Sequence, residues 1–275
     1  MQFIQTEDTT TISELRAALY QRFSAPVDAM WEMLYIASSQ PYLIENGTQK
    51  IGYCSIDDNE SLLQIFLNDG SNHLMDRVVK SLIDSKLISG AKLSSIESVS
   101  FNACLTYSRS VQTNTFCFQY YNRPLQNGPL LNIELVSQED IQAIKSFLKD
   151  QIGFDDTFGY TENLVQRREF YVVKGSGDII ATSECRLSDS QPEIADLGVI
   201  VNRDYQGKGI ATQVLKQQAN RAQEIKRRPI CSTTYDNVAS KKAIEKAGFY
   251  CSHIIFDINF ADNKTQKNDI PGFGI

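Results

Sequence analysis

Apolar and polar positions alternate in a way that predicts a mixed α/β arrangement for the second half of the chain. Strand-like apolar runs occupy residues 131–136, 194–201, 229–235 and 250–260, and two more flank Gly175 to Gly177 as a hairpin. Helical spacing covers 137–152, about 207–226 and 237–249, and a short helix is expected at the end of the irregular stretch 153–168. The predicted order β-α-α-β-β-β-α-β-α-β indicates an α/β fold, a mixed sheet with helices on its faces.

Local signals mark where these segments begin. Ser137 is the expected N-cap of the first helix, and Asp140, three residues later, completes a variant of the capping box. The stretch 120–132 holds two prolines, a glycine and three asparagines, so it is interpreted as the connection between two units.

The first half has a less regular pattern. Residues 49–69 are typical of a hairpin, 73–88 of an amphipathic helix, and 101–107 and 115–121 of strands. This order faintly repeats that of the second half, and we interpret it as a degenerate internal duplication. The alternative is an unrelated α+β extension. Residues 263–275 form a polar tail that is expected to pack poorly.

Composition excludes several classes of protein. The 275 residues carry a formal charge of −6 without blocks of Lys or Arg, which argues against a nucleic-acid partner. No apolar run approaches the roughly 18 residues of a membrane helix, and the first ten residues lack the apolar core of a signal peptide. We therefore predict a cytoplasmic protein that binds neither nucleic acid nor membranes.

Cysteine and histidine spacing argues against metal chemistry. The six cysteines are scattered without a CxxC pair, so they are expected to be reduced and buried. The only histidines, His73 and His253, lie far apart, and no metal site is expected. A serine hydrolase is equally hard to assemble, because no G-x-S-x-G motif occurs.

The stretch "VIVNRDYQGKGIATQVLKQQ" (199–218) places two glycines between a strand and a helix. The first backbone N–H groups of a helix have no partner within it, and the helix dipole adds positive charge there. Glycine leaves that backbone uncovered, so such a turn is suited to hold a phosphate. A P-loop is excluded by the absence of GxxxxGK[ST], and the dinucleotide motif fits poorly because Thr212 takes the place of its third glycine.

Two motifs resemble the GNAT superfamily of acyl-CoA N-acyltransferases. Residues Gln206 to Ala211 match its Q/R-x-x-G-x-G/A signature, and "NVASKKAIEKAGF" (237–249) resembles its second signature. The resemblance covers about 130–260. The expected division is a domain of unassigned role over 1–125, a GNAT domain over 130–262 and a tail over 263–275.

The resemblance implies a site for coenzyme A. The backbone amides after Gln206 would hold its pyrophosphate, and the strand before them, with a bulge suited to Gly198, would pair with its pantetheine arm. Asn237 and Ser240 would contact that arm near the thioester. Lys208 is equally a solvated turn lysine, and Asn237 equally a plain helix N-cap. The full cofactor set is Leu197, Val199, Val201, Gln206, Gly207, Lys208, Gly209, Ile210, Ala211, Asn237 and Ser240.

The catalytic groups are less certain from sequence, because Ile244 stands where the family often has a tyrosine that protonates the leaving thiolate. Tyr235 or Tyr250 would substitute, or the thiolate leaves unassisted. A base must also take a proton from the amine. The candidate bases, each alternatively a solvated carboxylate, are Glu193, Asp196 and Glu184. An acceptor loop, or an ordinary acidic loop, is expected at Asp155, Asp156, Phe158 and Tyr160.

The leading hypothesis is an acetyl-CoA-dependent N-acetyltransferase that transfers the acetyl group directly to a primary amine of a small molecule or peptide. One alternative is a non-catalytic acyl-CoA-binding module, and another is a nucleotide-binding oxidoreductase. Because the first half lacks the glycine signature, we expect that it does not bind coenzyme A. It would shape the acceptor cleft or supply the surface of a homodimer.

Overall fold

A computed structural model of the chain describes residues 1–121, 130–175 and 177–260. These residues form two compact units. Unit 1 comprises Met1–Thr115 together with 253–260, and unit 2 comprises Phe116–Ser252. Residues 122–129 of the predicted connection, and the predicted tail, lie outside the described residues.

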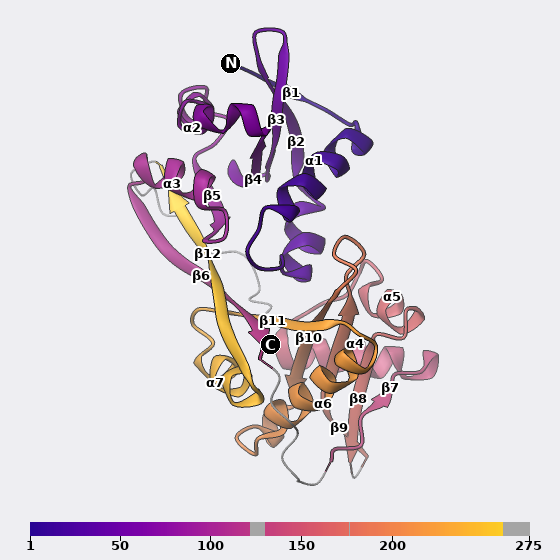
Figure 1. The fold of residues 1–275 in the computed structure, drawn as a ribbon. Coiled ribbons are helices and arrows are strands. Elements are labelled where there is room, and N and C mark those ends of the chain that lie inside the picture. Colours follow the sequence, from indigo (N-terminus) through magenta and orange to yellow (C-terminus); the bar gives the residue numbers. More distant parts are fainter. Residues whose placement is uncertain (122–129, 176, 261–275) are drawn as a thin grey trace. The chain divides into compact units, whose positions relative to one another are not determined.

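Unit 1 contains β1, a helix, a π-helical turn, three consecutive strands, and then helices that alternate with strands (Figure 1). Its elements are β1 (Gln2–Gln5), α1 (Thr9–Gln21), η1 (Trp31–Ile36), β2 (Gln40–Asn46), β3 (Gln49–Ile56), β4 (Ser61–Leu67), η2 (Asp69–Leu74), α2 (Met75–Asp84), β5 (Gly90–Ser94), α3 (Ser98–Thr106) and the first part of β6 (Ser110–Tyr120), which continues into unit 2 after Thr115.

Unit 2 repeats this order, with the additional 3₁₀ turn η3 and with α5 in the place of η1, which confirms the predicted order for the second half and the internal duplication. Its elements are β7 (Glu134–Leu135), η3 (Gln138–Asp140), α4 (Ile141–Ile152), α5 (Tyr160–Gln166), β8 (Phe170–Gly175), β9 (Asp178–Leu187), β10 (Ile194–Val201), η4 (Arg203–Tyr205), α6 (Ile210–Glu224), β11 (Arg228–Thr234), α7 (Val238–Ala247) and the first part of β12 (Phe249–Asn259), which continues into unit 1 after Ser252.

The strand order within each unit shows an exchange of the last strands. In unit 1 the order is β1-β2-β3-β4-β5-β12-β6, and in unit 2 it is β7-β8-β9-β10-β11-β6-β12. β12 pairs antiparallel with β5, from Ile255 opposite Ser94 to Asn259 opposite Gly90. The neighbour of β5 is therefore the strand from the far end of the chain, and the neighbour of β11 is the strand that ends the first half.

Two local expectations have clear outcomes. The capping box is confirmed, because the Asp140 carboxylate accepts hydrogen bonds from both the amide (3.1 Å) and the hydroxyl (2.8 Å) of Ser137. The strand expected at 101–107 is wrong, since residues 101–106 belong to α3 and Tyr107 is its C-cap. Ser100, Ala103 and Cys104 are buried at helical spacing, and a short apolar run does not distinguish a strand from a buried helix.

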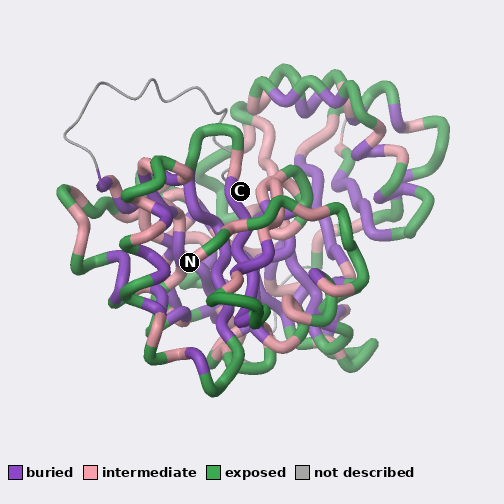
Figure 2. The backbone as a smooth tube through the Cα atoms, turned by 90° about the horizontal axis from the view of Figure 1, so that it is seen from above, coloured by how far each residue is buried: buried purple, intermediate pink, exposed green. Residues whose placement is uncertain are grey.

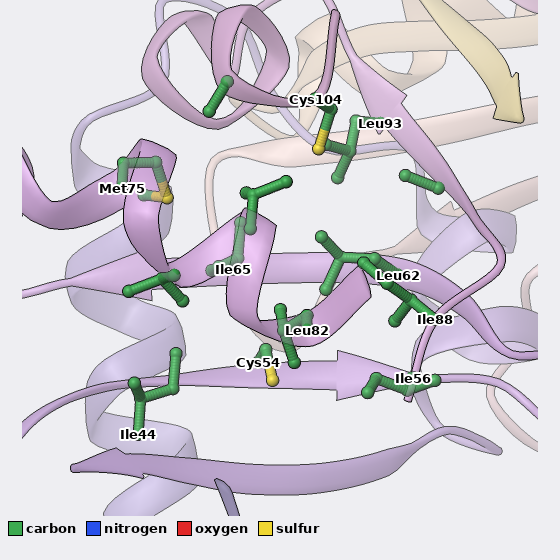
Figure 3. Packing of buried hydrophobic residues seen from close by; sticks show 14 of the residues in the cluster. Ile44, Cys54, Ile56, Leu62, Ile65, Met75, Leu82, Ile88, Leu93 and Cys104 are labelled. Carbon is green, nitrogen blue, oxygen red and sulfur yellow. The ribbon is translucent and has the colours of Figure 1, made fainter. Parts of the chain in front are cut away.

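Each unit has an apolar core where its strands meet its later helices, and in unit 1 a second cluster, with Tyr53 and Phe66, lies on the other face of the strands beside α1. In unit 1, side chains of β3, β4 and β5 meet Met75 and Leu82 of α2 and Cys104 of α3 (Figure 3). In unit 2, alternate residues of β10 meet α6 and α7. Buried residues gather along the strands, while loops and outer helix faces are exposed (Figure 2).

Three further observations concern the cysteines, membrane-spanning helices and metal-binding groups. The six cysteines all lie among the described residues and form no disulfide; five are buried as expected, whereas Cys251 is exposed. Among the described residues, no helix is long and apolar enough to cross a membrane. The same part of the chain contains no group of three His, Cys, Asp or Glu side chains arranged to hold a metal ion.

Candidate functional site

The central feature of unit 2 is a pair of parallel strands that separate. β10 pairs with β11 over only three positions, ending where Asp196 lies opposite Ile230. On its other side β10 pairs with β9 without a register shift from Ala195 to Val201. Beyond Asp196, the β10 edge that faces β11 therefore has no ladder partner within the described residues.

The bulge expected at Gly198 is not seen in the ladder with β9, and the glycine has a different reason. A Cβ at this position would lie 3.1 Å from Arg186 Nη1 and 3.4 Å from Glu184 Oε2. Gly198 thus leaves space for a pair of charged side chains on the neighbouring strand.

The open edge of β10 leads into the glycine turn. Gly207 (φ +75°) and Gly209 (φ +78°) adopt the left-handed conformation, and Gly209 is the N-cap of α6. Both are exposed, and a Cβ on either would meet no atom within 4 Å. No amide from Gly207 to Ala211 donates to a protein acceptor among the described residues. The turn therefore presents uncovered donors at the positive end of a fifteen-residue helix.

Side chains near the turn hold its shape. The side-chain NH₂ group of Gln206 donates to the backbone carbonyl of Val201 (3.3 Å), which ties the turn to the end of β10. Lys208 Nζ lies 3.2 Å from the carbonyl of Asp204 and 4.9 Å from the ring centroid of Tyr205. Lys208 is exposed, so its charge stands beside the amides without covering them.

The start of α7 contributes two of the predicted residues. Asn237 is the N-cap, and its side-chain oxygen accepts from the amide of Ser240 at 3.0 Å. Ser240 is buried, and its hydroxyl has no hydrogen-bond partner in the described part of the chain. Ile244, one turn further, is fully buried in the apolar core. The hydrogen bond from the Ser240 amide shows that Asn237 caps α7, which is one of the two roles that the sequence left open for it.

On the opposite face of β9 and β10, the structure brings together four buried polar side chains. Tyr160 donates its hydroxyl to Glu184 at 2.6 Å, and burial raises the pKa of that phenol to about 12. Arg186 contacts the same Glu184 carboxylate and lies 3.2 Å from Asp196. Two predicted bases and one predicted acceptor residue thus belong to a single cluster.

The other predicted residues lie apart from this cluster. Glu193 is exposed and precedes β10, and Tyr235 is 60% exposed. Asp155 is exposed and pairs with Lys149 at 3.1 Å. Asp156 is buried, and it accepts from the amides of Tyr160 (2.9 Å) and Thr161 (2.7 Å) at the start of α5. Although burial alone would raise it, these hydrogen bonds leave the Asp156 pKa below its ordinary value.

Phe158, the remaining predicted acceptor residue, is 63% exposed, and its ring packs near Phe154 and Tyr160. Sequence reasoning missed Arg186, which holds both buried acids. The signal was present in "SECRL", since Glu184 and Arg186 are two residues apart and must share one face of a strand.

Unit 1 has the same separated strands but a different turn. β4 pairs with β5 only at Ser61 and Leu62. After β4, the 3₁₀ turn η2 runs directly into α2, and the N-cap Leu74 has helical dihedrals. No glycine turn with uncovered amides is found there among the described residues.

Glu97 in unit 1 stands where Asn237 stands in unit 2. Each lies three residues after its strand, and its amide donates to the strand's last carbonyl, at 2.9 Å in unit 1 and 3.2 Å in unit 2. The Glu97 side chain turns back to accept from the amide of Ser94 (3.2 Å) rather than capping α3. It is buried, and burial raises its pKa to about 8.

Both units have separated parallel strands, and in unit 2 one of these strands leads into a glycine turn with uncovered amides. The sequence matches the profile "Acetyltransferase (GNAT) domain" over residues 8–121 and "Acetyltransferase (GNAT) family" over 138–249. The chain belongs to the GNAT acetyltransferases and carries two GNAT domains in tandem. Members of this family use acetyl-CoA as their co-substrate.

Solved structures agree with this assignment. The chain is similar to an acetyltransferase from the GNAT family of Colwellia psychrerythraea, with 28% identity, a TM-score of 0.88, and coverage of 95% of this chain and 100% of that one. A GCN5-related N-acetyltransferase from Sphaerobacter thermophilus shares the fold at 13% identity (TM-score 0.64, coverage 94% and 95%). A tandem GNAT protein from the clavulanic acid biosynthesis pathway does so at 12% identity (TM-score 0.59, coverage 96% and 99%). No curated protein matched the sequence.

Proposed function

We propose that this acetyltransferase moves an acetyl group from acetyl-CoA directly to a primary amine of a small molecule or peptide, without a covalent enzyme intermediate. The observation that carries the proposal is the continuous path from the open edge of β10 to the uncovered amides at Gly207 to Ala211. Uncovered amides at a helix start suit a diphosphate, and an unpaired strand edge suits the amide-bearing arm attached to it.

The predicted cofactor residues of unit 2 then contact different parts of coenzyme A according to their position. The turn amides, together with Gln206 and Lys208, hold the diphosphate. The side chains of Leu197, Val199 and Val201 lie in the apolar core or against it, so the backbone of these residues is the part that pairs with the arm. Asn237 and Ser240 contact the arm from α7.

The acceptor amine approaches, on this proposal, from the face that carries Tyr160 and Glu184. A protonated amine has no lone pair, so it must lose a proton before attack. Among the three candidate bases we favour Glu184, since it is joined to Tyr160, which follows directly on the acidic segment 155–158. Arg186 holds Glu184 and Asp196 in place. Glu193, being exposed, is the least favoured.

One observation favours a second candidate function. Ile244 is fully buried and supplies no proton donor, which suits a unit that binds acyl-CoA without turnover. Release of free thiol from acetyl-CoA with a panel of primary amines separates the two. Turnover with any amine supports the transferase, whereas tight binding without release across the panel supports the binding module.

The cofactor site itself is tested by Gly209→Glu. The added carboxylate stands among the turn amides and repels a diphosphate, so we expect calorimetry to detect no binding of acetyl-CoA. Gly47→Glu in the β2–β3 turn is the matched control, because Gly47 is also exposed, with φ +65° and no atom within 4 Å of a Cβ. The control should bind normally. Equal affinity of both variants for acetyl-CoA would refute the proposed diphosphate site in the glycine turn.

A further inference from the structure

The short π-helical turn η1 in unit 1 carries the only tryptophan of the chain. Its wide register is seen where the amide of Ala37 donates to the carbonyl of Glu32, five residues earlier, at 3.0 Å. The turn packs against β4. π-helical turns are rare in proteins and are found frequently at functional sites. This makes η1 a candidate position for a ligand in unit 1.

The rings of Trp31 and Tyr35 stack on this turn. Their centroids lie 4.5 Å apart, and their planes are inclined by 24°. Trp31 is buried whereas Tyr35 is half-buried, so the accessible part of the pair is the tyrosine ring. The face of an aromatic ring carries partial negative charge and attracts cations. A stacked pair with one accessible ring is therefore suited to a cationic ligand.

Three aspartates act on the phenol of Tyr35. Burial raises the pKa of this phenol, and the negative charges of Asp257, Asp28 and Asp57 raise it further. The three acids come from different elements, because Asp28 precedes η1, Asp57 follows β3, and Asp257 lies on β12. Lys92 on β5 supplies a positive charge nearby, with its Nζ 3.9 Å from Asp257 Oδ1. The charges that act on the tyrosine are those of the three acids, so the ring lies in negative surroundings.

Asp28 has a carboxylate oxygen that the chain does not use. The residue is only 6% exposed, and its Oδ1 accepts from the amide of Trp31 at 2.8 Å. Its Oδ2 is buried and has no hydrogen-bond partner among the described residues. The charge of Asp28 acts on His253, but burial lowers the pKa of that imidazole to about 4, so the histidine is neutral at neutral pH. Native proteins seldom leave a buried carboxylate oxygen without a donor, and here the neighbouring histidine brings no positive charge.

We propose that unit 1 binds a primary ammonium ion beside η1, where an N–H of the ligand donates to Asp28 Oδ2 and the positive charge is held by the Tyr35 ring and the surrounding aspartates. A primary ammonium is favoured over a quaternary one, because only the primary ion carries the N–H donor that Asp28 requires. All the residues involved belong to unit 1. The site uses neither the glycine turn nor coenzyme A, so the inference does not rest on the proposed function.

Because Trp31 is the only tryptophan, its fluorescence reports on this site without a label. The full chain is titrated, in the absence of coenzyme A, with n-butylammonium and with Nα-acetyl-lysine amide, which presents the same ammonium group as part of a peptide. We expect a saturable change with at least one of them, and their relative affinities assign the ligand to a free amine or to a lysine side chain. Tetramethylammonium should bind at least about tenfold more weakly, and neutral n-butanol should give no saturable change.

Variants of two residues test the contacts. Asp28→Asn keeps an oxygen for the amide of Trp31 and replaces the unpartnered oxygen with an NH₂ group, so the affinity for the ammonium ion should fall about tenfold or more. Asp8→Asn is the matched control and should leave the affinity unchanged, because Asp8 also accepts from an amide three residues later (Thr11, 3.1 Å) but is exposed. Tyr35→Leu should weaken binding about threefold or more, whereas Tyr35→Phe, which keeps the ring, should stay within about twofold of the wild type.

The proposal is overturned if neither primary amine gives a saturable change, or if n-butanol binds as well as n-butylammonium. Unchanged affinity in Asp28→Asn, or the same loss of affinity in Asp8→Asn, also overturns it. If Asp28→Asn failed to fold, Tyr35→Leu would decide, and full affinity in that variant would count against the site. Failure of the wild type to bind acetyl-CoA would refute the proposed function alone, because this titration contains no coenzyme A.

Discussion

At the scale of single residues, the clearest contrast is between Glu97 and Asn237, which hold the same place in their units. Asn237 turns forward and caps its helix, whereas Glu97 turns back toward its strand. The Glu97 carboxyl is buried with one oxygen unpartnered, and burial raises its pKa to about 8. A group that holds its proton at neutral pH acts as a neutral acid, so unit 1 carries no ionised carboxylate there.

This predicts that stability falls as pH rises. The unfolded chain loses the Glu97 proton near the ordinary carboxyl pKa, while the folded chain keeps it up to about pH 8. Between those values the unfolded state binds fewer protons, so the free energy of unfolding decreases with pH, by at most about 1.4 kcal/mol per unit. Glu97→Gln should be close to the wild type at pH 5 and more stable at pH 8.5. Urea unfolding of the wild type and Glu97→Gln at pH 5 and pH 8.5 tests this. The same difference in the free energy of unfolding between the two proteins at both pH values would contradict it.

At the scale of elements, Asn237 at the start of α7 caps the helix, and the proposed function gives the same side chain a second role in holding the cofactor arm. Asparagine and aspartate are comparably good N-caps, but only asparagine can also donate to a ligand. In this chain the cap bond is made by the side-chain oxygen. A substitution that keeps the oxygen and removes the NH₂ group therefore separates capping from cofactor binding.

We expect Asn237→Asp to leave the free energy of unfolding within about 0.5 kcal/mol of the wild type and to weaken coenzyme A binding about tenfold. Asn237→Ala should instead lose about 1 kcal/mol of stability, because the cap is removed. Thermal unfolding and calorimetry on both variants provide the measurements. Full affinity in Asn237→Asp would mean that the residue is an N-cap and nothing more.

The elements of unit 2 were predictable because their ends carry strong local chemistry. Ser137 with Asp140 and Gly207 with Gly209 mark where a helix begins, and this is also why the turn was found. The strand expected at 101–107 failed because nothing near it in the sequence separates a buried helix from a strand. Arg186 was missed because a charged residue in a strand is usually exposed, and its burial depends on Glu184 and Asp196.

At the scale of the whole molecule, the exchange of β6 and β12 was not predictable from the sequence. Nothing in the residues of either strand names its neighbour, because which strand each one joins depends on contacts between distant parts of the chain. The duplication itself was detected from the repeated order of elements. Identical order in the two halves does not tell which last strand pairs with β5.

The exchange predicts that unit 1 does not fold from its own half. Residues 1–121 lack β12, so β5, with buried Ala91 and Leu93, would have an open edge. We expect this fragment to unfold without a cooperative transition. A chain in which residues 253–260 follow Thr115 through an Asn-Gly turn restores the strand and should unfold cooperatively. Differential scanning calorimetry compares them, and a sharp transition in the shorter fragment would contradict the prediction.

The partner of β5 is β12, from the far end of the chain, so the order in which the chain is synthesised affects its folding. When the ribosome has completed the first half, the apolar edge of β5 has no neighbour, and it stays so until residue 259 has emerged. Nascent chains with unpaired strands are prone to associate with one another. Newly made copies of this protein should therefore depend on chaperones for as long as translation of the second half lasts.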